Sequence, residues 1–202
     1  MGTHNKSTQK LRMEIAHAAA KIMAVDGIND YLSAKKKAAM QLGIHQKKYM
    51  PANIEIEQAL MDYQRLFQQD SQPRHLQTLR QTAVNAMRLL EPFEPLLVGP
   101  VLSGTATKHS AVMLHLFCDE PEQIRFFLDE RGIPYADDES TVRNHPGELT
   151  PYPALRFLAE QIPVILVIMP RARKNTPTLS PVDGRPARRA KISEVEILLA
   201  NS

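Results

Sequence analysis

The stretch from Leu96 to Cys118 most constrains the fold, because two apolar runs lie there on either side of a glycine turn. Leu96–Leu102 is apolar and contains β-branched residues, which predicts a buried strand, and Val112–Phe117 predicts a second one. The sequence Ser103-Gly104-Thr105 between them is typical of a turn. Two short buried strands need other elements to cover them, so we expect the rest of the chain to supply that cover.

Apolar residues recur at helical spacing before this stretch. They predict helices over residues 11–25, from a cap at Asp30 or Ser33 to Leu42, over residues 53–67 and over residues 75–90. The polar, proline-containing sequence of residues 68–74 is typical of a linker. We therefore predict a disordered start at residues 1–10, a helical module at residues 11–70 and a second domain at residues 71–202 that ends in a basic segment.

The second domain combines helical and strand patterns. Residues 119–130 predict a helix, Ile162–Met169 predicts a fully buried strand, and residues 195–200 predict a short last helix. Residues 133–153 are polar and contain prolines and a glycine, which indicates an irregular hairpin or a flexible loop. Together these patterns predict an α+β fold, in which an N-terminal helical module is followed by a small mixed β-sheet with flanking helices.

Composition narrows the class of protein. With 43% apolar residues the chain can form a core, and its longest apolar runs are shorter than the roughly 20 residues of a membrane helix. The single cysteine, Cys118, excludes an intrachain disulfide and favours a reducing compartment. None of the seven histidines has the spacing of zinc ligands. We expect a cytoplasmic protein that is soluble, is not bound to a membrane and has no metal site.

Basic residues gather toward both ends of the chain. Residues 1–70 carry ten basic and seven acidic side chains, residues 71–170 carry eight and twelve, and residues 171–202 carry seven and three. Basic ends can meet a polyanion, although such residues can also be solvated, or the arginines can pair with the acidic middle of the chain. The candidate phosphate contacts are Lys35, Lys36, Lys37, Lys47, Arg171, Arg173, Arg188 and Arg189.

The pattern from Glu14 to Ile44 resembles the first two helices of tetracycline-repressor-type regulators, where an Ala-rich helix and a glycine precede a helix ending in Leu-Gly-Ile. The resemblance implies that a DNA-reading helix follows at once. Residues 45–50 are too few for one, because Pro51 breaks a helix at or before its predecessor. A DNA-binding regulator is therefore an alternative to a helical module that packs on the core.

The central stretch also carries a spacing of glycine, serine and apolar residues that resembles the signature of the nucleotidyltransferase superfamily, the DNA polymerase β-like fold, in its small bacterial form. In that family a Gly-Ser pair ends the first strand, and two aspartates on the second strand hold two magnesium ions. A third acidic residue lies on a later strand. The matching framework positions here are Gly99, Gly104, Ser110, Val112 and Leu114.

The residues that carry the family's chemistry are replaced. Pro100 stands at the phosphate-contacting serine, and Ala111 and Met113 stand at the two aspartates. Magnesium needs oxygen ligands, which alanine and methionine lack, and proline has no backbone N–H to offer a phosphate. The resemblance therefore implies a degenerate site, made up of Gly99, Pro100, Ser103, Gly104, Thr105, Ser110, Ala111, Met113 and Ile165.

This degeneracy favours a non-catalytic module that binds a nucleotide, RNA or another protein, and it predicts no cofactor. An active nucleotidyltransferase would need magnesium and relocated ligands, for which the candidates are Asp119, Glu120 and residues 137–139. The sequence alone leaves three functions open: the non-catalytic module, the relocated enzyme and the DNA-binding regulator.

Overall fold

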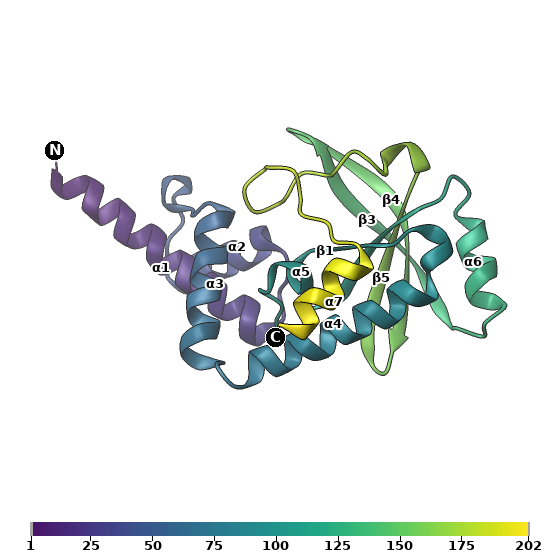
Figure 1. Cartoon of the computed structure of the whole chain (residues 1–202). Coiled ribbons are helices and arrows are strands. Elements are labelled where there is room, and N and C mark those ends of the chain that lie inside the picture. The colour runs from purple at the N-terminus through teal and green to yellow at the C-terminus, as the bar shows by residue number, and fades with distance from the viewer. Residues whose placement is uncertain (1, 202) are drawn as a thin grey trace. The chain divides into compact units, whose positions relative to one another are not determined.

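The computed structural model describes residues 2–201, which form helices and one five-stranded sheet (Figure 1). The chain divides into two compact units. The helical unit holds the residues up to Gln72 together with Thr107–His109, and the α/β unit holds Pro73–Ala106 and the residues from Ser110 onward. The assignment of Thr107–His109 to the helical unit was not predicted from the sequence.

The helical unit consists of α1 (Gly2–Asp26), α2 (Tyr31–Gln41), the short 3-10 helix η1 (Lys47–Tyr49) and α3 (Asn53–Phe67). Asp30 caps α2, and its carboxylate accepts a hydrogen bond of 2.7 Å from the backbone N–H of Ser33. Small side chains let the helices approach closely, because the buried core of this unit is rich in alanine.

The first helix begins earlier than we predicted. Residues 2–10 belong to α1, so the expected disorder is wrong for them, and Met1 lies outside the described residues. No glycine or proline occurs between Thr3 and Asp26. Because extending a formed helix is much easier than starting one, the buried half of α1 can propagate into the polar residues before it.

The α/β unit is built on a mixed sheet with the strand order β1-β2-β5-β4-β3. Strands β2 and β5 are parallel, and the other neighbours are antiparallel. This arrangement confirms the predicted α+β class. The strands are β1 (Leu96–Val98), β2 (Val112–Phe117), β3 (Tyr135–His145), β4 (Glu148–Ala159) and β5 (Ile162–Met169). The helices are α4 (Ser71–Leu89), η2 (Glu91–Phe93), α5 (Pro100–Ser103), α6 (Glu122–Asp129), η3 (Arg171–Arg173) and α7 (Ile192–Ala200).

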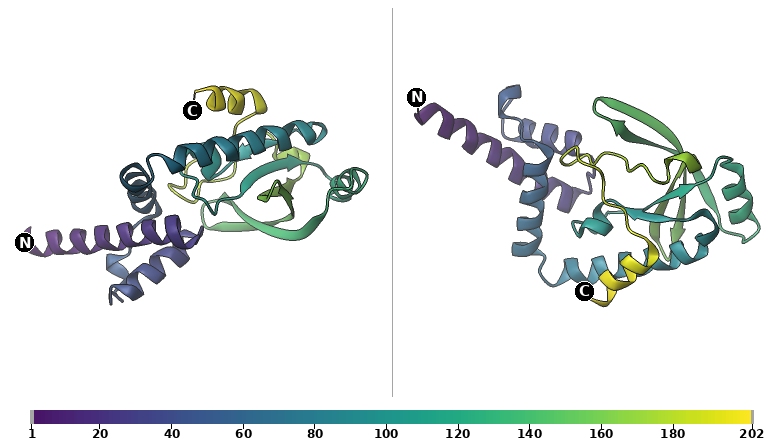
Figure 2. Two further views of the ribbon diagram at one scale, coloured as in Figure 1. Left: turned by 90° about the horizontal axis from the view of Figure 1, so that it is seen from below. Right: turned by 45° about the horizontal axis from the view of Figure 1, so that its top comes forward.

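Helices pack on one face of this sheet. In the left view of Figure 2, α4 and α7 lie on the same side of the strands. The main core joins side chains of α4, α6 and α7 to alternate strand residues such as Leu114, Leu116 and Leu166. Strand residues alternate between faces, so Met113, His115 and Phe117 of β2 point to the opposite face, which we call the second face. A smaller buried cluster of Phe117, Tyr152, Val167 and Met169 lies there.

Two strand predictions need correction. The first strand ends at Val98 rather than at Leu102, because Gly99 has a φ of 75° and Pro100 opens α5. Residues 135–145 and 148–159 form two long paired strands rather than an irregular hairpin. Pro151 and Pro153 fit in β4 because β5 pairs with β4 only over Ala154–Ala159, which leaves one edge of β4 unpaired at both prolines.

The described part of the chain contains no helix that is both long enough and apolar enough to cross a lipid bilayer.

Candidate functional site

The structure brings three of the predicted site positions together on the second face. Met113 and Ile165 are direct neighbours in the parallel pairing of β2 and β5, and both are half-buried. A Cβ atom added to Gly99 would lie 3.6 Å from the Met113 sulfur. Gly99 precedes α5 in a left-handed conformation that favours glycine. Met113 therefore lies next to both the Gly99 backbone and Ile165.

The loop that follows α5 holds the polar members of the predicted set. The hydroxyls of Ser103 and Thr105 lie 3.0 Å apart, and Gly104 between them ends α5 with a φ of 90°. Thr105 and Ser110 are buried. Pro100 is the first residue of α5 and offers no N–H there. Ala111 is half-buried and directly precedes β2.

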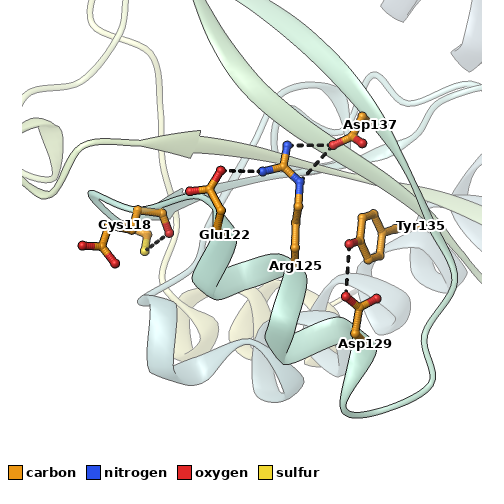
Figure 3. Close-up of polar contacts among 7 residues, drawn as sticks. Cys118, Glu122, Arg125, Asp129, Tyr135 and Asp137 are labelled. Atoms are coloured by element: carbon orange, nitrogen blue, oxygen red, sulfur yellow. Dashed lines mark hydrogen bonds and ion pairs between the residues drawn. The ribbon is translucent and has the colours of Figure 1, made fainter.

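Two of the carboxylates proposed as relocated metal ligands, those of Asp137 and Glu120, accept hydrogen bonds from side chains of α6. Arg125 of α6 bridges Glu122, at 3.1 Å, and Asp137 of β3, at 2.7 Å (Figure 3). Glu120 accepts a hydrogen bond of 2.9 Å from the Gln123 amide. The buried Cys118 thiol donates to the backbone carbonyl of Glu120 at 3.1 Å, which gives this cysteine a structural partner.

Two further acidic candidates have other partners. Asp138 pairs with Arg156 at 2.7 Å, and the Asp119 carboxylate accepts the backbone N–H of Arg171 at 3.0 Å. Asp137 and Asp138 point to opposite faces of β3, because neighbouring strand residues alternate. Among the side chains that the structure describes, no group of three or more from histidine, cysteine, aspartate and glutamate lies close enough together to hold a metal ion. The relocated ligands thus do not converge in this structure.

Four arginines that we predicted as phosphate contacts fall into two pairs. Arg171 and Arg188 are exposed, whereas Arg173 and Arg189 are half-buried. A guanidinium nitrogen of Arg173 donates to the Asn144 carbonyl oxygen at 2.6 Å, and one of Arg189 donates to the Lys174 carbonyl at 2.8 Å. None of the four forms an ion pair with a described carboxylate, so the alternative that they pair with the acidic middle of the chain does not hold for them.

The lysines of the helical unit have more ordinary surroundings. Lys35 donates to the Pro51 carbonyl at 2.8 Å and to the Asn53 side chain at 2.7 Å, and Lys37 pairs with Asp26 at 2.8 Å. Lys36 and Lys47 are exposed. Lys35 and Lys37 therefore already stabilise the ends of neighbouring helices, which weakens their interpretation as phosphate contacts.

His115 is the residue that sequence reasoning missed. It lies on β2 beside Met113 on the second face, is only 3% exposed, and its Nδ1 has no hydrogen-bond partner. Burial, and to a lesser degree the nearby positive charge of Arg189, lower the pKa of His115 to about 4. The only signal in the sequence was a histidine inside an apolar strand, where burying a polar ring costs free energy unless the ring is hydrogen-bonded.

Comparisons with known proteins found no matching family model, no matching curated protein and no matching solved structure.

The buried imidazole of His115 predicts a pH dependence of stability. An unfolded histidine titrates at about pH 6.5, and the folded His115 at about 4. Between these values the unfolded chain binds the proton and the folded chain does not, so acid favours unfolding. We expect the free energy of unfolding to fall as the pH drops from about 6.5 toward 4, as measured by urea unfolding followed by circular dichroism.

The variant His115→Leu should lose that part of the pH dependence. A matched control is His145→Gln, which removes an exposed imidazole from the same unit and should keep the wild-type slope. Equal slopes in wild type and His115→Leu would contradict the neutral, buried state of His115.

Proposed function

We propose that the α/β unit is a non-catalytic binding module of nucleotidyltransferase type, and that its ligand is a nucleotide, free or within RNA. The single observation that carries the proposal is the pairing of Met113 with Ile165 on neighbouring parallel strands. By the resemblance, these strands should carry acidic residues that hold magnesium. They instead place two side chains without oxygen atoms side by side, at paired positions of the ladder.

The order of the elements supports the same proposal. Helix α4 leads into β1, β1 pairs antiparallel with β2, and β2 pairs parallel with β5. Gly99 and the Ser103-Gly104-Thr105 loop occupy the turn between β1 and β2, where the resemblance implies contact with a nucleotide. Without carboxylates at positions 111 and 113, the affinity has to come from backbone groups, apolar contact and cationic side chains rather than from bridging metal ions.

Titration calorimetry with each nucleoside triphosphate, with and without magnesium, tests this proposal. We expect saturable binding whose affinity changes little when magnesium is removed. The site lacks the oxygen ligands through which a bound magnesium ion would strengthen nucleotide binding. Binding that requires magnesium would contradict the non-catalytic interpretation. Absence of binding to every nucleotide would contradict the ligand class.

A pair of bulky substitutions locates the site. Met113→Trp fills space beside Gly99, and Leu158→Trp adds the same bulk on β4, where the side chain is 68% exposed. If the nucleotide binds beside Gly99, Met113→Trp should weaken binding on the order of tenfold or more, since a blocked contact of about 1.4 kcal/mol has that effect. Leu158→Trp should leave the affinity unchanged.

A further inference from the structure

Two half-buried arginines of the α/β unit lack acidic partners. Arg173 and Arg189 each use one guanidinium N–H group, toward Asn144 and the Lys174 carbonyl respectively, although a guanidinium carries five such donors. The Nε of Arg173 is buried and has no hydrogen-bond partner. The carbonyl that Arg189 contacts belongs to Lys174, the residue next to Arg173, so the two cations lie in the same region of the unit. Burial and the positive charge of Arg173 lower the pKa of Arg189.

Ala190 bridges to Leu97 and lies in the main core, so the preceding Arg189 is directed to the second face of the sheet. His115 lies on that face, opposite Leu96 of β1. Its charge state is influenced by Arg189, and its unpartnered Nδ1 is buried on the second face of the sheet. Arg173 is tied to this face through Asn144, whose amide donates to the Tyr152 hydroxyl at 2.9 Å. Tyr152 belongs to the buried cluster of the second face. Three side chains from β2, η3 and the segment before α7 therefore converge on one region.

Such a cluster is unfavourable by itself. Two cations close together in a partly buried place repel each other, and buried donors without acceptors have lost their hydrogen bonds to water. Glu94 carries a nearby carboxylate, but it is paired with Lys174. A bound anion would satisfy the donors and neutralise the charge, and guanidinium groups match the geometry of tetrahedral oxyanions.

We infer that Arg173, Arg189 and His115 form a binding site for a tetrahedral oxyanion, of the kind presented by a phosphate group. Asn144 is a positioning residue, because it holds Arg173 while Tyr152 and Thr150 hold its own amide at 2.9 Å each. Arg171 and Arg188 are exposed and are not part of the site. The inference goes beyond the proposed function and does not depend on it, since it concerns a different set of residues.

Sulfate is a suitable probe, because it stays dianionic where phosphate esters gain a proton, near pH 6. Titration calorimetry at constant ionic strength, with chloride as the balancing anion, should show saturable binding of sulfate and of inorganic phosphate. Arg173→Gln and Arg189→Gln should each weaken binding on the order of tenfold, as expected for loss of a charge-assisted hydrogen bond. Arg188→Gln is the matched control and should bind like wild type.

A second readout concerns His115. A bound dianion favours the imidazolium, so sulfate should bind more tightly as the pH falls from 7 to 5 and should take up a proton. Proton uptake is measured by repeating the calorimetry in buffers of different ionisation enthalpy. In His115→Leu, sulfate should still bind, but without proton uptake.

The outcomes separate this site from the nucleotide proposal. No saturable sulfate or phosphate binding to the wild-type protein, or equal binding by Arg189→Gln and Arg188→Gln, would overturn the anion site even if nucleotides bind. Sulfate binding without any nucleotide binding would support the anion site and remove the nucleotide proposal. The titration of the wild-type protein needs no substitution, so it can overturn the anion site even if a variant fails to fold.

Discussion

Replacing Leu114 by alanine is expected to lower the free energy of unfolding of the α/β unit by about 2–5 kcal/mol, the range for deletion of a large core side chain. Leu114 lies in the middle of β2, pairs with Leu97 on one side and Leu166 on the other, and all three side chains are fully buried. Neighbours held in three adjacent strands have little freedom to collapse into the space, so a cavity should remain.

Hydrogen exchange of backbone amides measures this loss unit by unit. The chain has no tryptophan, and the two units need separate probes, which peptides from β2 and β5 and peptides from α1–α3 provide. Leu114→Ala should accelerate exchange in the strand peptides and leave those of the helical unit unchanged. The control Leu158→Ala removes a leucine that is 68% exposed and should change the stability by less than about 0.5 kcal/mol. Similar losses in both variants would contradict the position of Leu114 in the core.

The buried elements of this protein could be predicted from sequence because burial leaves a pattern. Val112–Phe117 and Ile162–Met169 are continuous apolar runs, and both are strands with the predicted bounds. Residues 53–67 place apolar side chains at helical spacing, and α3 begins at the predicted Asn53 and ends at Phe67, close to where we predicted. In the two strands burial on both faces leaves a continuous apolar run, whereas α3 is recognised by its helical spacing, since it buries only one side.

Exposed and strained elements left weaker signals. Strands β3 and the first half of β4 are polar on most positions, so long-range pairing rather than local pattern decides their conformation. The end of β1 depends on the left-handed backbone of Gly99, a single dihedral that an apolar run hides. Within the candidate site, the pairing of Met113 with Ile165 is a matter of strand register, and the cluster around His115 joins residues far apart in sequence. Neither can be read from spacing along the chain.

The second large effect is expected at Gly27, where alanine should lower the free energy of unfolding of the helical unit by about 2–5 kcal/mol. Gly27 has a φ of 75°, a region that costs other residues about 1–2 kcal/mol. An added Cβ would also lie 2.7 Å from Cγ of His109, which is too close for two carbon atoms. Overpacking of this kind adds about 1–3 kcal/mol, because the ring or the backbone has to move.

Gly43→Ala is the matched control. Gly43 lies in the same unit, has a φ of 66°, and an added Cβ would meet nothing within 4 Å. Gly43→Ala should therefore lose only the free energy of placing alanine at a positive φ, about 1–2 kcal/mol. Urea unfolding and hydrogen exchange of α1 peptides measure this loss.

A double-mutant cycle isolates the contact with His109. His109→Ala removes the ring and its 3.1 Å contact between Nε2 and the Val25 carbonyl, so alone it should destabilise modestly. In the double variant Gly27→Ala/His109→Ala the clash with Cγ is gone. Its loss of unfolding free energy should therefore be smaller than the sum of the losses of the two single variants, by about 1 kcal/mol or more. Strict additivity, or equal losses for Gly27→Ala and Gly43→Ala, would show that His109 does not pack on Gly27. The segment Thr107–His109, which interrupts the α/β unit in sequence, would then have no fixed place in the helical unit.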